Sequence, residues 1–220
     1  MTDTEFDYHN GFYTLNAESK PEDCRKLYED AKDSYEKIAF ENMKYIAPMI
    51  TAEFLVKHLE QLGFSQDVRI LDLGCGTGMV GEELNRRGYK NIDGVDICGA
   101  LVDKAKEKGL YTKLTVGEMA SEDSKKLNVA ADQYDAAACA GVFTLGHVKG
   151  KGFDDFLHIL KSGGIACFTV RKMAWDDKVY GFVEKMEKLC EMKKWKIVEK
   201  KFVDNYTAED GCWLFCCQKL

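Results

Sequence analysis

The stretch ILDLGCGTGMV, residues 70–80, decides the fold of this 220-residue chain. It opens as a short apolar run of the kind that forms a buried parallel strand, and a helical pattern starts at Val80. Between the two, Gly74, Gly76 and Gly78 let the backbone turn tightly and approach a ligand where a Cβ atom would collide. The sequence therefore predicts a strand, a ligand-binding turn and a helix in succession.

The same alternation continues along the chain. Further strand-like segments lie at 91–97, 110–116, 134–140 and 164–170, and helical patterns lie at 100–108, near 152–161 and at about 176–193. Strands separated by helices imply right-handed crossovers and a parallel sheet covered on both faces. Two more strand-like stretches, 195–203 and 212–219, have no helix between them and must pair antiparallel at the end of the sheet.

Length and composition indicate one α/β domain over residues 1–220. We expect residues 1–62 to form an N-terminal lid and helices, with a break at Pro48, and residues 63–220 to form the core. No Pro-, Gly- or Ser-rich linker interrupts this region.

The charge and cysteine content exclude several classes of function. A net charge of −6 argues against general binding to nucleic acid. The acidic N-terminus is unlike a secretory signal, and no apolar segment reaches the roughly 18 residues of a membrane span, so we expect a cytoplasmic protein. Nine scattered cysteines without a C-x-x-C pair favour buried, reduced thiols over disulfides, and we predict no metal site.

The glycine turn favours one cofactor over another. In a dinucleotide-binding motif the third glycine would stand at Met79, and Asp72 would repel a pyrophosphate while suiting an ammonium group. The turn therefore points to S-adenosylmethionine. Asp96, at the end of the next strand, is placed to accept hydrogen bonds from ribose hydroxyls, as in both cofactor classes. Glu118 and Met119 follow the third strand, where they either contact adenine or form a solvated turn.

The chain resembles the class I methyltransferases, and within them the methyltransferase-like protein family of the Williams–Beuren syndrome chromosomal region. The resemblance rests on YEDAKDSY (28–35), YIAP (45–48), residues 70–80, GVDI (94–97), GLY (109–111) and SGGIACFTVR (162–171). It implies a Rossmann-like fold with an N-terminal helical lid and a seven-stranded, mostly parallel sheet of order 3-2-1-4-5-7-6, with strand seven antiparallel. Glu29 and Glu36 replace the Asp of many relatives, but the neighbouring tyrosines carry the contact.

The resemblance and the residues together give a set of predicted cofactor contacts. These are Tyr28, Tyr35, Asp72, Gly74, Cys75, Gly76, Gly78, Met79, Asp96, Ile97, Glu118, Met119, Ala140 and Gly141.

The methyl acceptor is expected at the topological switch point, beside the end of the fourth strand. His147 is a candidate general base there, although a surface or loop-packing role is slightly favoured for it. Arg171 suits an acceptor carboxylate or an ion pair with an acid such as Asp176. The predicted acceptor contacts are Tyr8, Tyr13, Val142, Phe143, Arg171, Trp175 and Trp213, although ordinary core packing explains most of the aromatic ones.

These features predict an S-adenosylmethionine-dependent methyltransferase acting on nitrogen or oxygen of a small molecule, with a mild preference for an amine. A protein methyltransferase and a non-catalytic, cofactor-binding regulator are the alternatives. We expect a small-molecule partner, neither nucleic acid nor membrane, and a monomer or homodimer. Residues 6–15 carry four aromatic side chains and are expected to form a flap that orders on binding.

Overall fold

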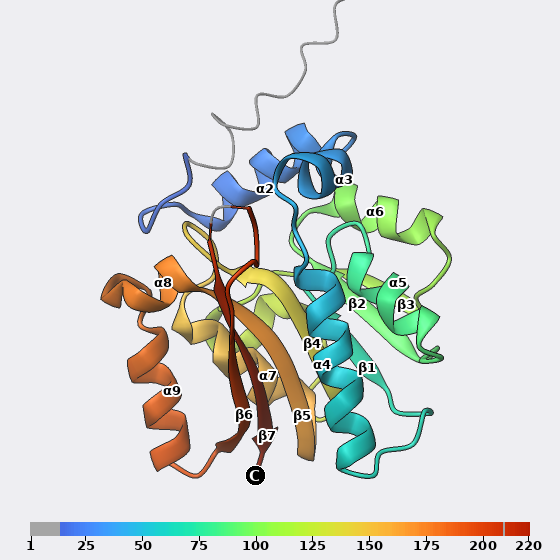
Figure 1. Cartoon of the computed structure of the whole chain (residues 1–220), viewed down its shortest axis with the longest axis vertical. Helices are drawn as coiled ribbons and strands as arrows, with labels where there is room; N and C mark the ends of the chain where they lie inside the picture. The colour runs from blue at the N-terminus through green and yellow to red at the C-terminus, as the bar shows by residue number, and fades with distance from the viewer. Residues whose placement is uncertain (1–13, 209) are drawn as a thin grey trace, which may run out of the picture.

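The computed structural model describes residues 14–208 and 210–220, which form a twisted seven-stranded sheet covered by helices (Figure 1). The strand order is β3-β2-β1-β4-β5-β7-β6, as expected. Strand β7 runs antiparallel to both of its neighbours, and the other pairings are parallel. The strands are β1 Ile70–Leu73, β2 Ile92–Asp96, β3 Lys113–Val116, β4 Tyr134–Phe143, β5 Leu160–Arg171, β6 Trp195–Val203 and β7 Cys212–Lys219.

Helices cover both faces of the sheet and one of its ends (Figure 1). Helices α4 (Ala47–Gln61) and α5 (Met79–Arg86) pack on one face, and α7 (Phe153–Ile159) and α9 (Phe182–Glu191) on the other. Helix α6 (Gly99–Glu107) packs against β2 and β3. The lid, above the carboxyl ends of the central strands, contains α2 (Pro21–Ala31), α3 (Tyr35–Lys37) and the π-helical turn η1 (Ile38–Asn42). The short helices are η2 (Glu122–Leu127), η3 (Gly150–Gly152), α8 (Lys172–Asp176) and η4 (Lys178–Tyr180).

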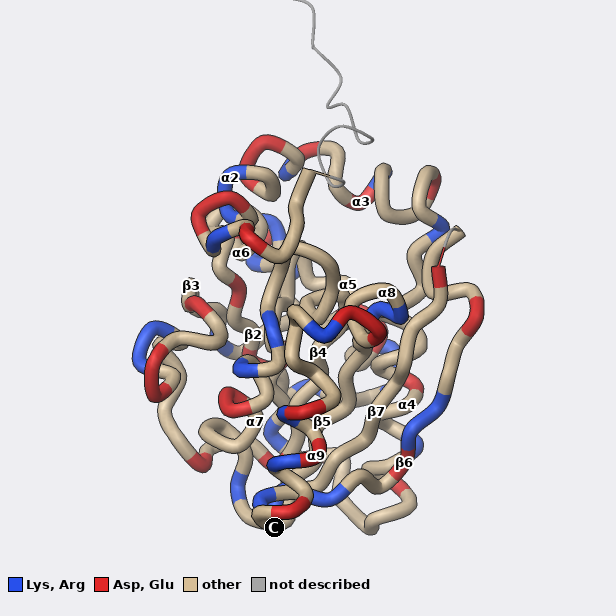
Figure 2. The backbone as a smooth tube through the Cα atoms, turned by 90° about the vertical axis from the view of Figure 1, so that its left-hand side faces the viewer, with Lys and Arg blue, Asp and Glu red and all other residues tan. Residues whose placement is uncertain are grey.

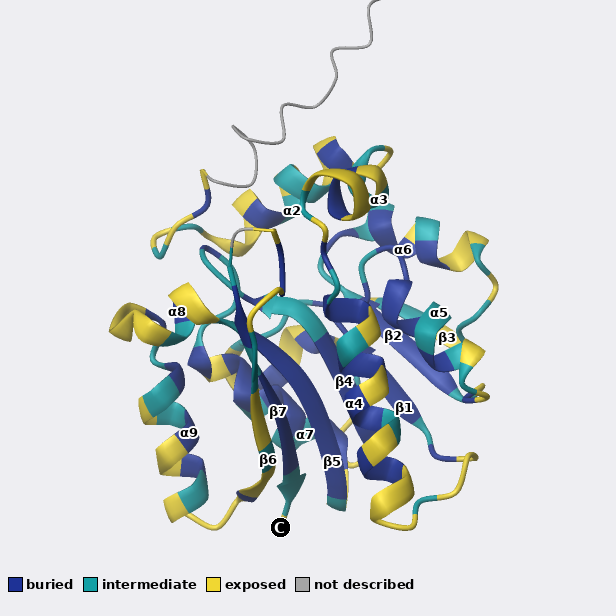
Figure 3. Cartoon of the chain, viewed as in Figure 1, coloured by how far each residue is buried: buried dark blue, intermediate teal, exposed yellow. Residues whose placement is uncertain are grey.

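Most of the core lies in two apolar layers, one on each face of the sheet, whose central strands are largely buried (Figure 3). A smaller cluster around Ala39 and Cys212 lies beneath the lid. The layer beneath α7 and α9 is largely aromatic: the ring of Phe168 stacks on Phe156 at 5.0 Å and on Phe215 at 5.4 Å. Burying each such side chain contributes about 1.5–3 kcal/mol. These layers fix the strands whose carboxyl ends carry the site described below.

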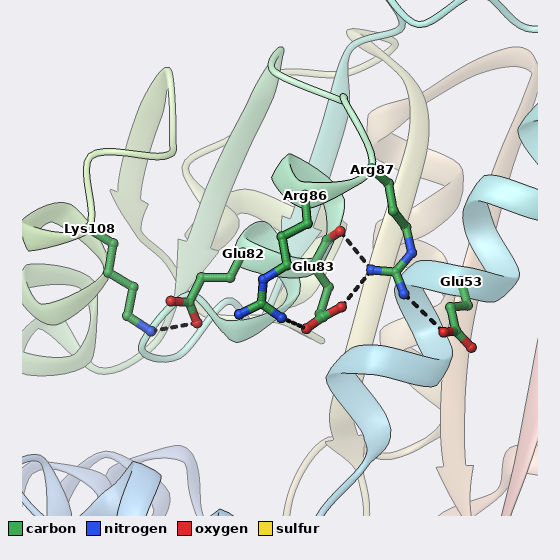
Figure 4. Close-up of polar contacts among 6 residues, drawn as sticks. All are labelled: Glu53, Glu82, Glu83, Arg86, Arg87 and Lys108. Carbon is green, nitrogen blue, oxygen red and sulfur yellow. Dashed lines mark hydrogen bonds and ion pairs between the residues drawn. The ribbon is translucent and has the colours of Figure 1, made fainter.

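Charged residues of both signs are interleaved over the surface in the view of Figure 2. Ion pairs join neighbouring helices. Arg87, which follows the last residue of α5, contacts Glu83 of α5 and also Glu53 of α4 at 3.0 Å (Figure 4). Lys108 contacts Glu82 of α5 at 3.0 Å and Glu36 of the lid at 2.6 Å. Through these contacts the charged surface ties the lid and two helices together.

Several element boundaries differ from the sequence expectation. The helix expected at 176–193 is divided, because Gly181 adopts a left-handed φ of +63° and separates η4 from α9. Strand β5 begins at Leu160 rather than 164, and a β-bulge in its pairing with β4 accommodates the extension. All nine cysteines are free thiols. None of the described helices has the length and apolar character needed to cross a membrane.

Candidate active site

The glycine turn after β1 borders a cavity of about 360 Å³ at the carboxyl end of the sheet. Gly74 has a φ of +81°, and a Cβ there would lie 2.2 Å from Val142 of β4, so only glycine allows this approach. Gly76 also has a positive φ, but a Cβ there would meet nothing within 4 Å. Because Gly76 lines the cavity, that space is available to a bound molecule.

Asp96 ends β2 and closes one side of the same cavity. One carboxylate oxygen accepts the Gly76 N–H and the other accepts the Cys98 N–H, both at 2.8 Å. Burial raises the pKa of Asp96, and these backbone hydrogen bonds oppose the rise. The carboxylate is thus held rigidly, and its remaining lone pairs are available to hydroxyl groups of a ligand.

Asp72 lies outside the cavity, although the sequence analysis places it against the cofactor. Its side chain is fully buried, and Oδ2 accepts the Tyr111 O–H at 2.7 Å. The other oxygen, Oδ1, has no hydrogen-bond partner among the described residues. Burial raises the pKa of Asp72 to about 7. A direct contact between Asp72 and the cofactor stays a prediction that the cavity lining does not support.

The other predicted cofactor contacts divide in the same way. Tyr28, Tyr35, Gly74, Gly76, Asp96, Ile97, Glu118, Met119, Ala140 and Gly141 line the cavity. Cys75, Gly78 and Met79 do not: Gly78 caps α5 with a φ of +94°, and Met79 packs in the cluster around Ala39 and Cys212. The turn therefore presents alternate residues to the cavity and to the helix behind it.

The lid covers the cavity with two tyrosines. The rings of Tyr28 and Tyr35 meet edge to face with centroids 5.6 Å apart. Burial raises the pKa of both phenols, so both stay protonated near neutral pH. The lid thus provides two uncharged hydroxyl groups and two aromatic rings.

His147 lies beneath this lid in one defined tautomer. Its Nδ1 lies 2.8 Å from the Leu145 carbonyl oxygen, which can only accept, so Nδ1 carries the hydrogen. Nε2 then accepts the Tyr28 O–H at 2.7 Å. Burial lowers the pKa of His147, so the ring is neutral near pH 7. The Tyr28 hydroxyl is thus hydrogen-bonded to an unprotonated ring nitrogen of His147, and the two side chains form a dyad.

A second cavity of about 100 Å³ adjoins the first. Tyr28, Tyr35, Gly141 and His147 line both. The second is completed by residues from the lid and from the ends of β4, β5 and β6: Leu15, Ala39, Met43, Tyr45, Thr144, Leu145, Arg171, Tyr206 and Thr207. The two cavities meet at Gly141 and the dyad, beside the end of β4.

Arg171 lines the second cavity as an ion pair. Its Nε donates to Asp210 Oδ2 at 3.0 Å, and both side chains are nearly buried. Asp176, the partner considered from the sequence, instead pairs with Lys172. The charge of Arg171 is therefore already balanced by the protein.

The other predicted acceptor contacts that the structure describes do not line the second cavity. Val142 lines the first cavity, whereas the Phe143 side chain points into the aromatic core against Phe153. Trp175 and Trp213 pack together and hold the ammonium of Lys200, 3.9 Å from the Trp213 ring centroid. Tyr8, Tyr13 and most of the expected flap fall outside the described residues.

Tyr45 and Asp210 are not among the contacts predicted from the sequence, and Tyr206 is only one of several aromatic residues that could form a cage around the acceptor. Tyr45 and Tyr206 meet edge to face at 5.4 Å, and the pKa of both phenols is raised by burial. They are far apart in the sequence. Tyr45 begins the YIAP stretch (45–48) that contributes to the family resemblance, but that stretch predicts no contact for its side chain. The only available signal was the aromatic content of the lid and of the late loops.

Comparison with known proteins agrees with this arrangement. Residues 70–164 match a family model described as a methyltransferase domain. Methyltransferase-like protein 27 of Homo sapiens is 32% identical over 127 residues, which cover 58% of this chain and 49% of that protein. Ubiquinone biosynthesis O-methyltransferase of Xylella fastidiosa is 32% identical over 98 residues, which cover 44% of this chain and 39% of that enzyme. The chain thus spans half or less of the length of these relatives.

A solved structure shows the same fold. Magnesium protoporphyrin IX methyltransferase from Synechocystis PCC 6803, with bound SAH, aligns with a TM-score of 0.67 at 13% identity. The alignment covers 91% of this chain and all of that one. The expected Rossmann-like fold and the resemblance to the methyltransferase-like family are both confirmed.

Proposed function

We propose, from the match of residues 70–164 to a methyltransferase family and from the fold around them, that this chain methylates a nitrogen or oxygen atom of a small molecule. S-adenosylmethionine is the methyl donor. The observation that carries the proposal is the pair of adjoining cavities, of about 360 and 100 Å³, which meet at Gly141 and the Tyr28–His147 dyad. The larger suits a nucleotide-sized cofactor and the smaller suits a compact acceptor.

The residues around the larger cavity fit the cofactor. Gly76 leaves room where a Cβ would stand, and Asp96 offers a fixed, half-buried acceptor to ribose hydroxyls. Glu118 and Met119 line the part of the cavity after β3, where a polar and an apolar side chain suit the edge and face of adenine. When bound, S-adenosylmethionine supplies a methyl group activated for in-line displacement by its sulfonium.

The chain's own residues would position and deprotonate the acceptor. The Tyr28 oxygen can take up a proton from the molecule that is to be methylated, while the hydroxyl proton of Tyr28 moves to His147 Nε2. The Leu145 carbonyl keeps the ring oriented throughout, because it holds the Nδ1 hydrogen. The lid tyrosines border the cavity, and any water that they exclude on acceptor binding would strengthen these hydrogen bonds. His147 is therefore proposed as the general base, acting through Tyr28.

Four tyrosines around the smaller cavity favour an amine as the acceptor: Tyr28, Tyr35, Tyr45 and Tyr206. Aromatic faces attract a cation, and the Arg171–Asp210 pair places no unbalanced positive charge beside it. A protonated amine must lose a proton before its lone pair can attack, which gives the dyad its role.

The test is production of S-adenosylhomocysteine with pools of small amines, phenols and carboxylic acids, and separately with a protein extract. We expect turnover with an amine pool, and a loss of about 10²–10⁴-fold in kcat for His147→Gln at unchanged cofactor affinity. Tyr28→Phe should lose activity similarly. Turnover confined to the protein extract would overturn the small-molecule acceptor. Cofactor binding without any turnover would favour a non-catalytic regulator.

A further inference from the structure

A second group of reactive side chains lies on the α4 face of the sheet, outside both cavities. It begins with His58 of α4, which is only 1% exposed. Its Nδ1 lies 2.7 Å from the Phe54 carbonyl oxygen and therefore carries a hydrogen. Its Nε2 lies 3.2 Å from Glu199 Oε2. Two acceptors cannot face each other at this distance unbridged, so either a proton or a metal cation lies between them.

Two buried thiols converge on the same point. Cys167 of β5 and Cys216 of β7 are paired in the sheet register, and both are fully buried. Their Sγ atoms and a ring nitrogen of His58 all lie within 4.8 Å of one another. Glu199 of β6 pairs with Cys216 in the register, which brings its carboxylate to the rim of this group. Three strands and one helix thus supply four ligand-type side chains.

We propose that His58, Cys167, Cys216 and Glu199 bind one zinc ion. Two sulfurs, one imidazole nitrogen and one carboxylate oxygen form a donor set that suits tetrahedral Zn²⁺, with Zn–S bonds of about 2.3 Å. Binding requires each thiol to release its proton to solvent, which leaves two thiolates as ligands. The partly exposed Glu199 provides the route by which the ion enters.

Two features of the surroundings suit a metal site. Metal-binding histidines commonly donate their other ring N–H to a carbonyl, as His58 does to Phe54, which fixes the tautomer and aims Nε2 at the ion. The two thiolates and the carboxylate together carry one more negative charge than Zn²⁺ neutralises. Lys57, whose ammonium lies 2.6 Å from Glu199 Oε2, balances that charge. The ion would fasten α4 to the β5-β7-β6 edge of the sheet.

Cobalt titration of the purified full chain, reduced with a phosphine, tests the proposal without any activity assay. We expect one equivalent of Co²⁺ to give thiolate-to-cobalt charge-transfer absorbance and intense tetrahedral d–d bands, and Zn²⁺ to displace it. The matched variants are Cys216→Ala and Cys217→Ala. Both side chains are buried, but Cys217 packs in the apolar layer on the opposite face of the sheet.

Cys217→Ala should keep the cobalt spectrum and the rise in thermal stability caused by Zn²⁺. Cys216→Ala should lose the charge-transfer band and bind at least about tenfold more weakly. Absence of charge-transfer absorbance in the wild-type protein would overturn the proposal and identify the bridge as a proton in a His58–Glu199 ion pair. Equal spectra for the two variants would also overturn it, and the wild-type titration decides even if Cys216→Ala fails to fold.

Discussion

Asp72→Asn should change how stability depends on pH. The folded-state pKa of Asp72 is raised by burial from 3.8 to about 7, so the folded protein holds a proton that the unfolded chain releases. This contribution favours folding below pH 4 and is lost as the pH rises towards 7. Each tenfold change in proton affinity is worth about 1.4 kcal/mol, so the ionised carboxylate costs about 4 kcal/mol at pH 8. Asparagine is neutral at every pH and escapes this cost.

Urea unfolding of wild type and Asp72→Asn at pH 4.5 and pH 8 measures the effect. About 1 kcal/mol of the cost is already present at pH 4.5, so the stability difference between the two proteins should move by about 3 kcal/mol in favour of the variant as the pH rises to 8. Comparing the two proteins cancels the titration of most other groups, and Asp103→Asn, on the exposed side of α6, controls for loss of one charge. A difference that stays constant between the two pH values would refute the buried carboxyl described here.

Three further changes test separate parts of the structure. Gly76→Val should weaken S-adenosylhomocysteine binding by more than about tenfold in a calorimetric titration. The valine side chain would occupy the cavity, and the φ of +52° at this position adds strain of about 1–2 kcal/mol. An affinity equal to that of the wild type would show that the cofactor does not bind beside Gly76. Gly141→Ala should lower turnover, since its Cβ would lie 1.9 Å from the Tyr45 hydroxyl, and the double variant with Tyr45→Phe should recover part of the loss. If the double variant recovers no turnover, the loss is not caused by a clash with the Tyr45 hydroxyl. Glu53→Gln should cost no more than about 1 kcal/mol in urea unfolding, because the pair of Glu53 with Arg87 is exposed, and a loss above about 2 kcal/mol would contradict a surface ion pair.

The fold was predictable because its signals are local. Alternating strand and helix patterns predicted the sheet, and the bounds of β6 and β7 agree with the expected 195–203 and 212–219. The element boundaries differ from the prediction where the backbone conformation at a single position sets them. Gly181 divides the last helical region, and a β-bulge extends β5 towards its N-terminus, and neither feature interrupts the apolar pattern.

The candidate site was only partly predictable. The glycine turn, Asp96 and His147 follow from their positions after strands, and the structure brings all three to one cavity. The smaller cavity depends on Tyr45 and Tyr206, which come together only in the folded chain. Periodicity also could not tell which aromatic side chains face the site.

The proposed zinc ligands were missed for a similar reason. Cys167 is the only cysteine of β5, and Cys216 shares β7 with Cys212 and Cys217, so no short spacing joins the two ligands. The absence of a C-x-x-C pair also led to the expectation that no metal binds. Their proximity arises from the antiparallel pairing of β5 with β7.

Calorimetric titration with S-adenosylhomocysteine, and in parallel with NADH, tests the central claim most directly. We expect micromolar binding of S-adenosylhomocysteine and none of NADH. Asp96→Ala should lose about 1–3 kcal/mol in binding free energy, because the ribose would lose a half-buried acceptor. Binding of NADH, or of neither ligand, would contradict the assignment of this cavity to S-adenosylmethionine.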